Sequence, residues 1–254
     1  MIRTLRLLAA AVVLLATVPA HAVKIGGLTV VVPVAIHGPG AQSTQWQTDL
    51  WISNPYTIEQ DITVTYCPNS AAPAAFSVHI GKLSTIEVRD VVLTRFGLDN
   101  SKGMLVLHSE GASQFSAQAR IFNTGNPIGE FGQFVPGIST AYLDWQGFIP
   151  GLSGVDGNRT NVGIANPWDH EISCQVFVRD GDGTYIGGAR TVTVPPMTVL
   201  QVNDIFTAWG IPPQDNLQLD INGTSSGDRF YAYASVVRDG SGDAIFIFGT
   251  SPNA

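Results

Sequence analysis

The sequence predicts an all-β protein made of two tandem antiparallel β-sandwiches, and three observations lead to that prediction. Apolar and polar residues alternate in short runs, as in 62–66 (Ile-Thr-Val-Thr-Tyr) and 217–221 (Leu-Gln-Leu-Asp-Ile). This period of two is typical of strands with one buried face. Turn signals separate the runs, among them Asn54-Pro55, Asp180-Gly181, Asn222-Gly223 and Asp239-Gly240. Finally, blocks of similar sequence recur along the chain in the same order.

The recurring blocks predict a duplication. The matched segments are 48–55 with 160–167, 78–90 with 192–204, Gly97 with Gly210, and 115–119 with 230–234. Chance would explain one short match, but four collinear matches indicate two copies of one unit with loop insertions between them. We place the boundary between Gly137 and Trp145. The first β-sandwich is therefore expected over residues 23–140 and the second over residues 141–254.

Residues 1–22 have the features of a secretory signal peptide. Arg3 and Arg6 precede an apolar run over 7–18, and Ala20-His21-Ala22 forms a cleavage site of small residues. We expect a mature chain that begins at Val23 and is secreted or periplasmic, as is typical of bacterial export. A membrane anchor is the less favoured alternative, because the run is shorter than the ~20 residues that span a bilayer. No later segment is apolar enough to span a membrane.

One short helical turn is expected in each copy. Asp90 and Asp204 stand where a helix N-cap would, and Gly97 and Gly210 stand where such a turn would end. We therefore assign the repeated aspartates a structural role, as caps whose carboxylates accept backbone N–H groups. A catalytic acid is the less favoured interpretation.

The chain resembles a group of exported bacterial proteins built from tandem immunoglobulin-like sandwiches. The resemblance rests on residues 48–50 with Asn54-Pro55, the Val-x-Asp turn at 88–90, and residues 132–136 (Gly-Gln-Phe-Val-Pro). It extends over nearly all of residues 30–248. It implies two immunoglobulin-like sandwiches and implies no activity.

Composition and motifs argue against several chemistries. The net charge of −7 speaks against nucleic-acid binding, which needs a basic surface. The segment 180–184 (Asp-Gly-Asp-Gly-Thr) resembles the start of a calcium loop, but Thr191 stands where the bidentate Glu would be, so we favour a hairpin turn. We expect no metal, no cofactor and no enzymatic activity. The four histidines of the mature chain follow no repeat: His37, His79, His108 and His170.

The two cysteines are expected to stay unpaired even though export would permit a disulfide. Cys67 and Cys174 fall at non-equivalent positions in separate copies. Cys174 alternates in phase with Val176 and Val178, which indicates a side chain in a core. Cys67 is expected near a strand end.

Three function classes remain open. The favoured one is a noncatalytic binding or structural module for an unknown protein or glycan at the cell exterior. The first alternative is a carbohydrate-binding or adhesive protein, and its candidate ligand contacts are Trp46, Trp51, Tyr56 and Trp168. Trp51 alternates with Leu50 and Ile52 and should point away from their core. The second alternative is a hydrolase that uses scattered His, Asp and Glu residues.

Overall fold

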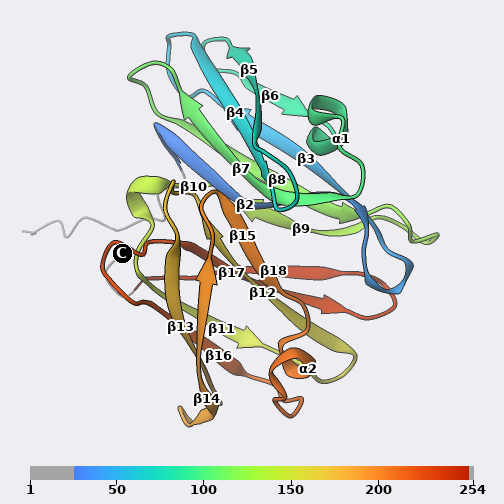
Figure 1. Ribbon diagram of the computed structural model, residues 1–254. Coiled ribbons are helices and arrows are strands. Elements are labelled where there is room, and N and C mark those ends of the chain that lie inside the picture. Colours follow the sequence, from blue (N-terminus) through green and yellow to red (C-terminus); the bar gives the residue numbers. More distant parts are fainter. Residues whose placement is uncertain (1–25, 252–254) are drawn as a thin grey trace, which may run out of the picture.

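The computed structural model describes residues 26–251 and confirms the all-β prediction (Figure 1). The signal-peptide prediction falls on residues 1–22, which lie outside the described residues. We call residues 26–140 the N-terminal half and residues 141–251 the C-terminal half. None of the helices within residues 26–251 combines the length and the apolar character that crossing a bilayer would require.

The strands of the N-terminal half are β1 (Gly26–Gly27), β2 (Thr29–Pro39), β3 (Gln45–Ser53), β4 (Gln60–Pro68), β5 (Ala74–Ile80), β6 (Thr85–Val88), β7 (Ser101–Ser109), β8 (Phe115–Asn123), β9 (Phe131–Pro136) and β10 (Ile138–Ser139). Those of the C-terminal half are β11 (Gln146–Leu152), β12 (Asn158–Asn166), β13 (Ile172–Arg179), β14 (Tyr185–Val194), β15 (Thr198–Val202), β16 (Leu217–Gly223), β17 (Tyr231–Arg238) and β18 (Ala244–Phe248). The helices are α1 (Val91–Phe96) and α2 (Ile205–Trp209), with short 3-10 turns at Ala41–Ser43 and Thr140–Tyr142.

All strand pairs are antiparallel within the described residues. The strands of the N-terminal half form one hydrogen-bonded sheet that folds over at β2, because the body of β2 pairs with β7 while its end pairs with β3. One layer of this half therefore has the order β2-β7-β4-β5, and the other has β6-β3-β8-β9. The C-terminal half has two separate sheets, β11-β16-β13-β14 and β15-β12-β17-β18.

The strand pairings of the two halves match one another. The layer β2-β7-β4-β5 corresponds to β11-β16-β13-β14, and β6-β3-β8-β9 corresponds to β15-β12-β17-β18. Leu50, Ile52, Val64 and Val88 of strands β3, β4 and β6 are buried, as are Val162, Ile164 and Val176 at the matching positions of the C-terminal half. Val202, the counterpart of Val88, is half-buried. The two-domain division and the immunoglobulin-like assignment stay predictions.

The repeated Thr-Asp/Asn pair ties strands together through its side chains. Thr48 Oγ1 donates to Ile36 O and accepts from Ile36 N, each at 2.8 Å, and Thr160 makes the same two bonds to Ser153. The next residue, Asp49 or Asn161, accepts the backbone N–H of the aspartate that precedes the helix. These buried bonds give the repeated motif a structural reason, because a buried polar group without a partner is costly.

The asparagine of the repeated Asn-Pro corner has a similar role. Asn54 Nδ2 donates to Ile58 O and Gly81 O, and Asn166 Nδ2 donates to the carbonyls of His170 and Val194. Each side chain thereby satisfies carbonyl groups where the chain leaves a strand.

The prediction that Asp90 and Asp204 cap helices through their carboxylates is wrong. Both residues occupy the position before the helix, but their backbones are left-handed, with φ of 44°, and neither side chain accepts a helix N–H. This left-handed backbone differs from the extended conformation that an N-cap residue normally has. Asp90 instead contacts His37, and Asp204 accepts from the Thr207 hydroxyl.

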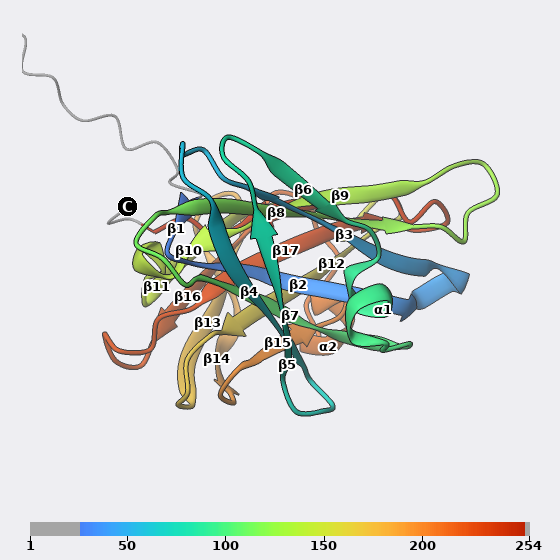
Figure 2. The ribbon, with the colours of Figure 1, turned by 90° about the horizontal axis from the view of Figure 1, so that it is seen from above.

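The sheet that contains β12 and β17 is buried on both faces. Ala232 and Ala234 of β17 lie in the core of the C-terminal half, whereas the alternating Tyr231 and Tyr233 belong to the core cluster of the N-terminal half. All four side chains are buried. In Figure 2, β2 lies over this sheet, in agreement with its contacts to β12 and β17.

Specific hydrogen bonds also join the halves. The Asn69 side chain donates to Val199 O at 2.7 Å and accepts from Val199 N at 3.2 Å, so it binds the backbone of β15 as another strand would. The Tyr231 hydroxyl donates to Pro136 O at 2.8 Å. Together with the buried tyrosines, these contacts fix how the halves sit together.

The close fit at this sheet generates a stability prediction. A Cβ at Gly163 would overlap the ring of Tyr233, its cross-strand partner, so Gly163→Ala should cost about 1–3 kcal/mol, as overpacking does. Urea denaturation measures the change. Gly188→Ala is the matched control, because open space surrounds that glycine. Equal stability of the two variants would contradict the described packing.

Candidate functional site

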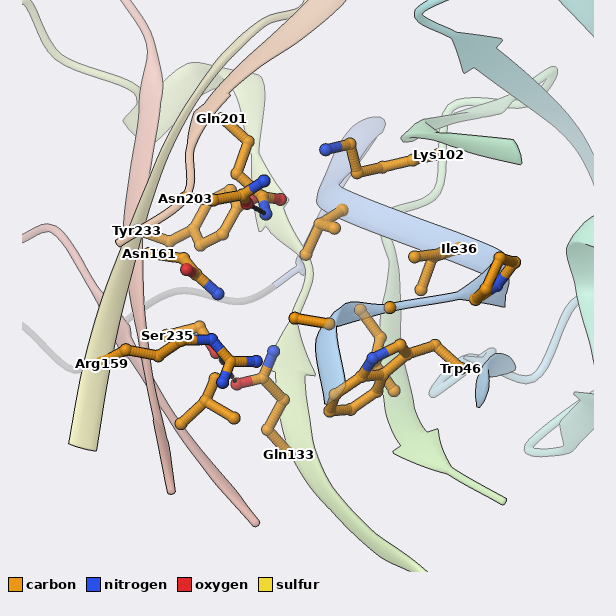
Figure 3. A pocket seen from close by; sticks show the side chains of 16 residues that line it. Ile36, Trp46, Lys102, Gln133, Arg159, Asn161, Gln201, Asn203, Tyr233 and Ser235 are labelled. Atoms are coloured by element: carbon orange, nitrogen blue, oxygen red, sulfur yellow. Dashed lines mark hydrogen bonds between the residues drawn. The ribbon is translucent and has the colours of Figure 1, made fainter. Parts of the chain in front are cut away.

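The strongest candidate site is a cleft between the two halves, with a volume of about 210 Å³. Strands from both halves line it (Figure 3). The N-terminal half provides mostly apolar side chains, and the C-terminal half provides mostly polar ones. The residues used below are Ile36, Trp46, Lys102, Gln133, Arg159, Asn161, Gln201, Asn203, Tyr233 and Ser235.

Trp46 forms part of the apolar wall. Its ring is only 8% exposed, and its Nε1 donates to Thr44 Oγ1 at 2.8 Å. Gly40 lies against the indole, and a Cβ there would collide with the ring nitrogen. The glycine and the threonine therefore hold the indole in one orientation at the edge of the cleft.

The polar wall is an ordered network of amides. The Tyr233 hydroxyl donates to Gln201 Oε1 at 3.1 Å, and Gln201 Nε2 donates to Asn203 Oδ1 at 2.6 Å. On the other side, Ser235 Oγ donates to Gln133 Oε1 at 2.7 Å. These bonds fix the amides before any ligand arrives, which reduces the entropy lost on binding.

Two cations line the same cleft. Arg159 Nη1 lies 2.7 Å from Asp239 Oδ1, and this pair secures the guanidinium group at one end. Lys102 is half-buried, and burial lowers the pKa of its ammonium group from the ordinary value. The lining includes no Asp, Glu, His or Cys residue.

The four aromatic residues proposed from the sequence are not brought together. Trp46 lies in the cleft, whereas Trp51 lines a shallow groove on the outer face of β3, β8 and β9. Trp51 is half-buried while Leu50 and Ile52 are fully buried, so its predicted outward direction is confirmed.

The other two aromatic candidates lie apart from both sites. Tyr56 is 41% exposed beside the Asn54 corner. Trp168 packs at the meeting of the two cores, and its Nε1 donates to Arg229 O at 2.6 Å.

The histidines do not converge on one site either. His37 Nδ1 lies 2.9 Å from Asp90 Oδ1, and its Nε2 lies 3.5 Å from Asp99 Oδ1, so each ring nitrogen faces a carboxylate. His108 Nδ1 lies 2.8 Å from Thr29 Oγ1 on the surface.

The remaining two histidines also have acidic neighbours. His79 lies beside Asp61 and Glu59, and the hydrogen bond that its ring donates to the Asp61 carboxylate is the main cause of its raised pKa. His170 lies beside Asp169. Within residues 26–251, no three His, Cys, Asp or Glu side chains form a group that could hold a metal ion.

The segment 180–184, which the sequence assigns to a hairpin, connects β13 to β14 as a turn. Asp180 Oδ1 accepts the backbone N–H groups of Asp182 and Thr184, at 3.0 and 2.8 Å. The carboxylate of Asp180 is thus used within the turn.

Sequence reasoning missed most of the cleft. Four separate segments contribute Lys102, Gln133, Arg159 and the neighbouring Gln201 and Asn203, and these residues form no single motif. One signal was present, because Tyr231 and Tyr233 alternate with Ala232 and Ala234. Apolar or aromatic side chains on both faces of a strand indicate a second packing partner, and the cleft lies where that partner makes contact.

Comparison with known proteins finds no family model that matches this chain and no curated protein with a significant sequence match.

The two cysteines provide a direct chemical prediction. Both Cys67 and Cys174 are free and fully buried, and burial raises their thiol pKa values to about 11 and about 12. Because the thiolate is the reactive form, both should resist alkylation at pH 8 in the folded protein and react in urea without reductant. Intact-mass measurement checks both points. A mass two hydrogens lighter with no label in urea would show a disulfide, and rapid labelling without urea would contradict the burial.

Proposed function

We propose that this chain is an exported, noncatalytic binding protein whose ligand site is the cleft between its two halves. The observation that supports the proposal most is the composition of the cleft. It combines a positioned tryptophan, a preformed amide network and two cations. Binding sites commonly have an apolar wall with a few placed polar groups, and they commonly lie where two structural units meet.

The size of the cleft restricts the ligand. Sites for drug-sized molecules have volumes of about 300–1,000 Å³, and this cleft has about 210 Å³. The volume favours a small molecule, or one terminal group of a larger glycan. Export is proposed from the signal-peptide features of residues 1–22, and the two immunoglobulin-like domains from the repeated sequence blocks.

The absence of carboxylates and imidazoles from the cleft lining supports a binding role over hydrolysis at this site. General acid–base catalysis most often uses those groups within hydrogen-bond reach of the substrate. The most buried histidine–carboxylate pair outside the cleft is His37–Asp90. In that pair, both ring nitrogens face carboxylates instead of a nucleophilic hydroxyl or thiol.

One observation favours the carbohydrate alternative at a different place. The outer groove is lined by Trp51, Gln118, Arg120, Gln133 and Phe134, and the Phe134 side chain is 54% exposed. Exposed flat rings beside amide and guanidinium groups could stack on a sugar and bind its hydroxyl groups. An extended glycan fits this open groove better than it fits the narrow cleft.

The five tryptophan indoles allow one experiment to separate these sites. A panel of small acids, sugars and alcohols is titrated into ¹⁵N-labelled mature protein, and the indole N–H signals are followed by NMR. We expect saturable shifts of the Trp46 signal, with Trp209 unchanged as an internal control. Shifts at Trp51 without Trp46 would favour the outer groove, and no saturable shift at any indole would contradict the proposal.

A blocking variant tests the location independently. Asn203 is exposed at the edge of the cleft, so Asn203→Trp should fill the cleft without disturbing the core. The ligand that shifts the Trp46 signal in the unaltered protein should then cause no saturable shift. Gln175→Trp, at an exposed position on β13, is the matched control. Undiminished binding by the Asn203 variant would contradict the proposed site.

A further inference from the structure

The hydrogen bonds of the amide network leave N–H groups facing the cleft. The carbonyl oxygens of Gln201 and Asn203 each accept a hydrogen bond within the network. The Asn203 Nδ2 group donates no hydrogen bond to another described residue. The same holds for Gln133, whose Oε1 accepts from Ser235 while its Nε2 remains available.

Asn161 adds a further donor. Its Oδ1 accepts the backbone N–H of Asp204 at 3.0 Å, which fixes the orientation of the amide and leaves Nδ2 for the cleft. In Figure 3 the nitrogen of Asn161 points toward the open space between the halves. Within residues 26–251, no fully buried side-chain nitrogen or oxygen lacks a partner, so the available N–H groups of these cleft-lining residues are not fully buried.

The cations add charge to this set of donors. The Lys102 side chain forms no ion pair or hydrogen bond with another residue of the described chain, and it extends across the cleft toward Gln201 and Asn203 (Figure 3). Arg159 keeps further N–H groups beyond the one bound to Asp239. A half-buried ammonium group without a counter-ion, in a protein of net charge −7, favours an anion as its partner.

Comparison of the halves gives an independent argument. Asn161 occupies the place that Asp49 has in the N-terminal half, and both side chains accept the same backbone bond. An aspartate at position 161 would therefore keep the oxygen that accepts this backbone bond. The residue in the cleft is Asn161, however. Its amide has an N–H donor where an aspartate would have a second, negatively charged oxygen.

From this donor-rich lining we infer that the cleft binds an oxyanion, carried by a small organic molecule whose apolar side lies against Trp46 and Ile36. The inference rests on the proposed function and specifies its ligand class. A carboxylate or phosphate only accepts hydrogen bonds, whereas each hydroxyl of a neutral sugar also donates one. The available groups of this cleft are N–H donors, so they suit a carboxylate or a phosphate better than a neutral sugar.

Matched pairs of probes test the inference by calorimetric titration. Glucuronate and glucose 6-phosphate are compared with glucose, and benzoate is compared with benzyl alcohol. Loss of a charged hydrogen bond weakens binding by about 10-fold or more, so we expect at least that preference for an acid over its neutral partner. Comparison of glucuronate with glucose 6-phosphate also distinguishes a carboxylate ligand from a phosphate ligand. Comparison of glucuronate with benzoate distinguishes a sugar from an aromatic ring.

Two variants locate the effect. Asn161→Asp keeps the acceptor of the backbone bond and places a negative charge in the cleft, so the bound acid should lose at least about 10-fold in affinity. Asn222→Asp is its control, since Asn222 also accepts a side-chain bond but lies outside the cleft. Lys102→Met should weaken binding similarly, whereas exposed Lys82→Met should not.

The outcomes separate this inference from the proposed function. Equal affinity for acids and neutral partners, no saturable binding of any acid, or an unaffected Asn161→Asp variant would each overturn the oxyanion inference. A neutral ligand that shifts Trp46 would overturn it too, yet leave the proposed binding cleft standing. Binding that leaves Trp46 unchanged would contradict both.

Discussion

The structure depends on one sheet, β15-β12-β17-β18, that is buried on both of its faces. Alternation along β17 makes this possible, because Ala232 and Ala234 fill the core of their own half while Tyr231 and Tyr233 fill the contact with the other half. The two hydroxyl groups are satisfied there by Pro136 O and Gln201. Burial of such large rings is a major hydrophobic contribution. The relative position of the halves, and hence the cleft between them, follows from this contact.

The two halves share their strand pairings. They differ in the residues on the outer faces of the sheets β6-β3-β8-β9 and β15-β12-β17-β18, because only the second of these faces is covered by the other half. The repeat places Ser116 and Gln118 where β17 has Tyr231 and Tyr233, and it places Trp51 where β12 has Gly163. In the C-terminal half the small Gly163 makes room for Tyr233 under a packed layer. In the N-terminal half the same face is open to solvent. The halves thus share residues that build each core and differ in those on the outer faces of these two sheets.

The sequence was sufficient for features that depend on local chemistry. Alternation predicted the strands, and the phase of Cys174 predicted its burial. The capping role of Asp90 failed because its backbone is left-handed and its carboxylate contacts His37, which is distant in sequence. Most of the cleft could not be predicted, since Lys102, Gln133 and Asn203 meet only after the halves dock. Trp46 alone among its lining residues was proposed from sequence.

The central claim is that the doubly buried sheet makes the two halves one cooperative unit. Differential scanning calorimetry of the mature protein tests it most directly. We expect a single unfolding transition, with a calorimetric enthalpy equal to the van't Hoff enthalpy. The double substitution Tyr231→Ser and Tyr233→Gln introduces the residues found at the equivalent N-terminal positions. It should split the single unfolding transition into two. Two well-separated transitions in the unaltered protein would contradict the account.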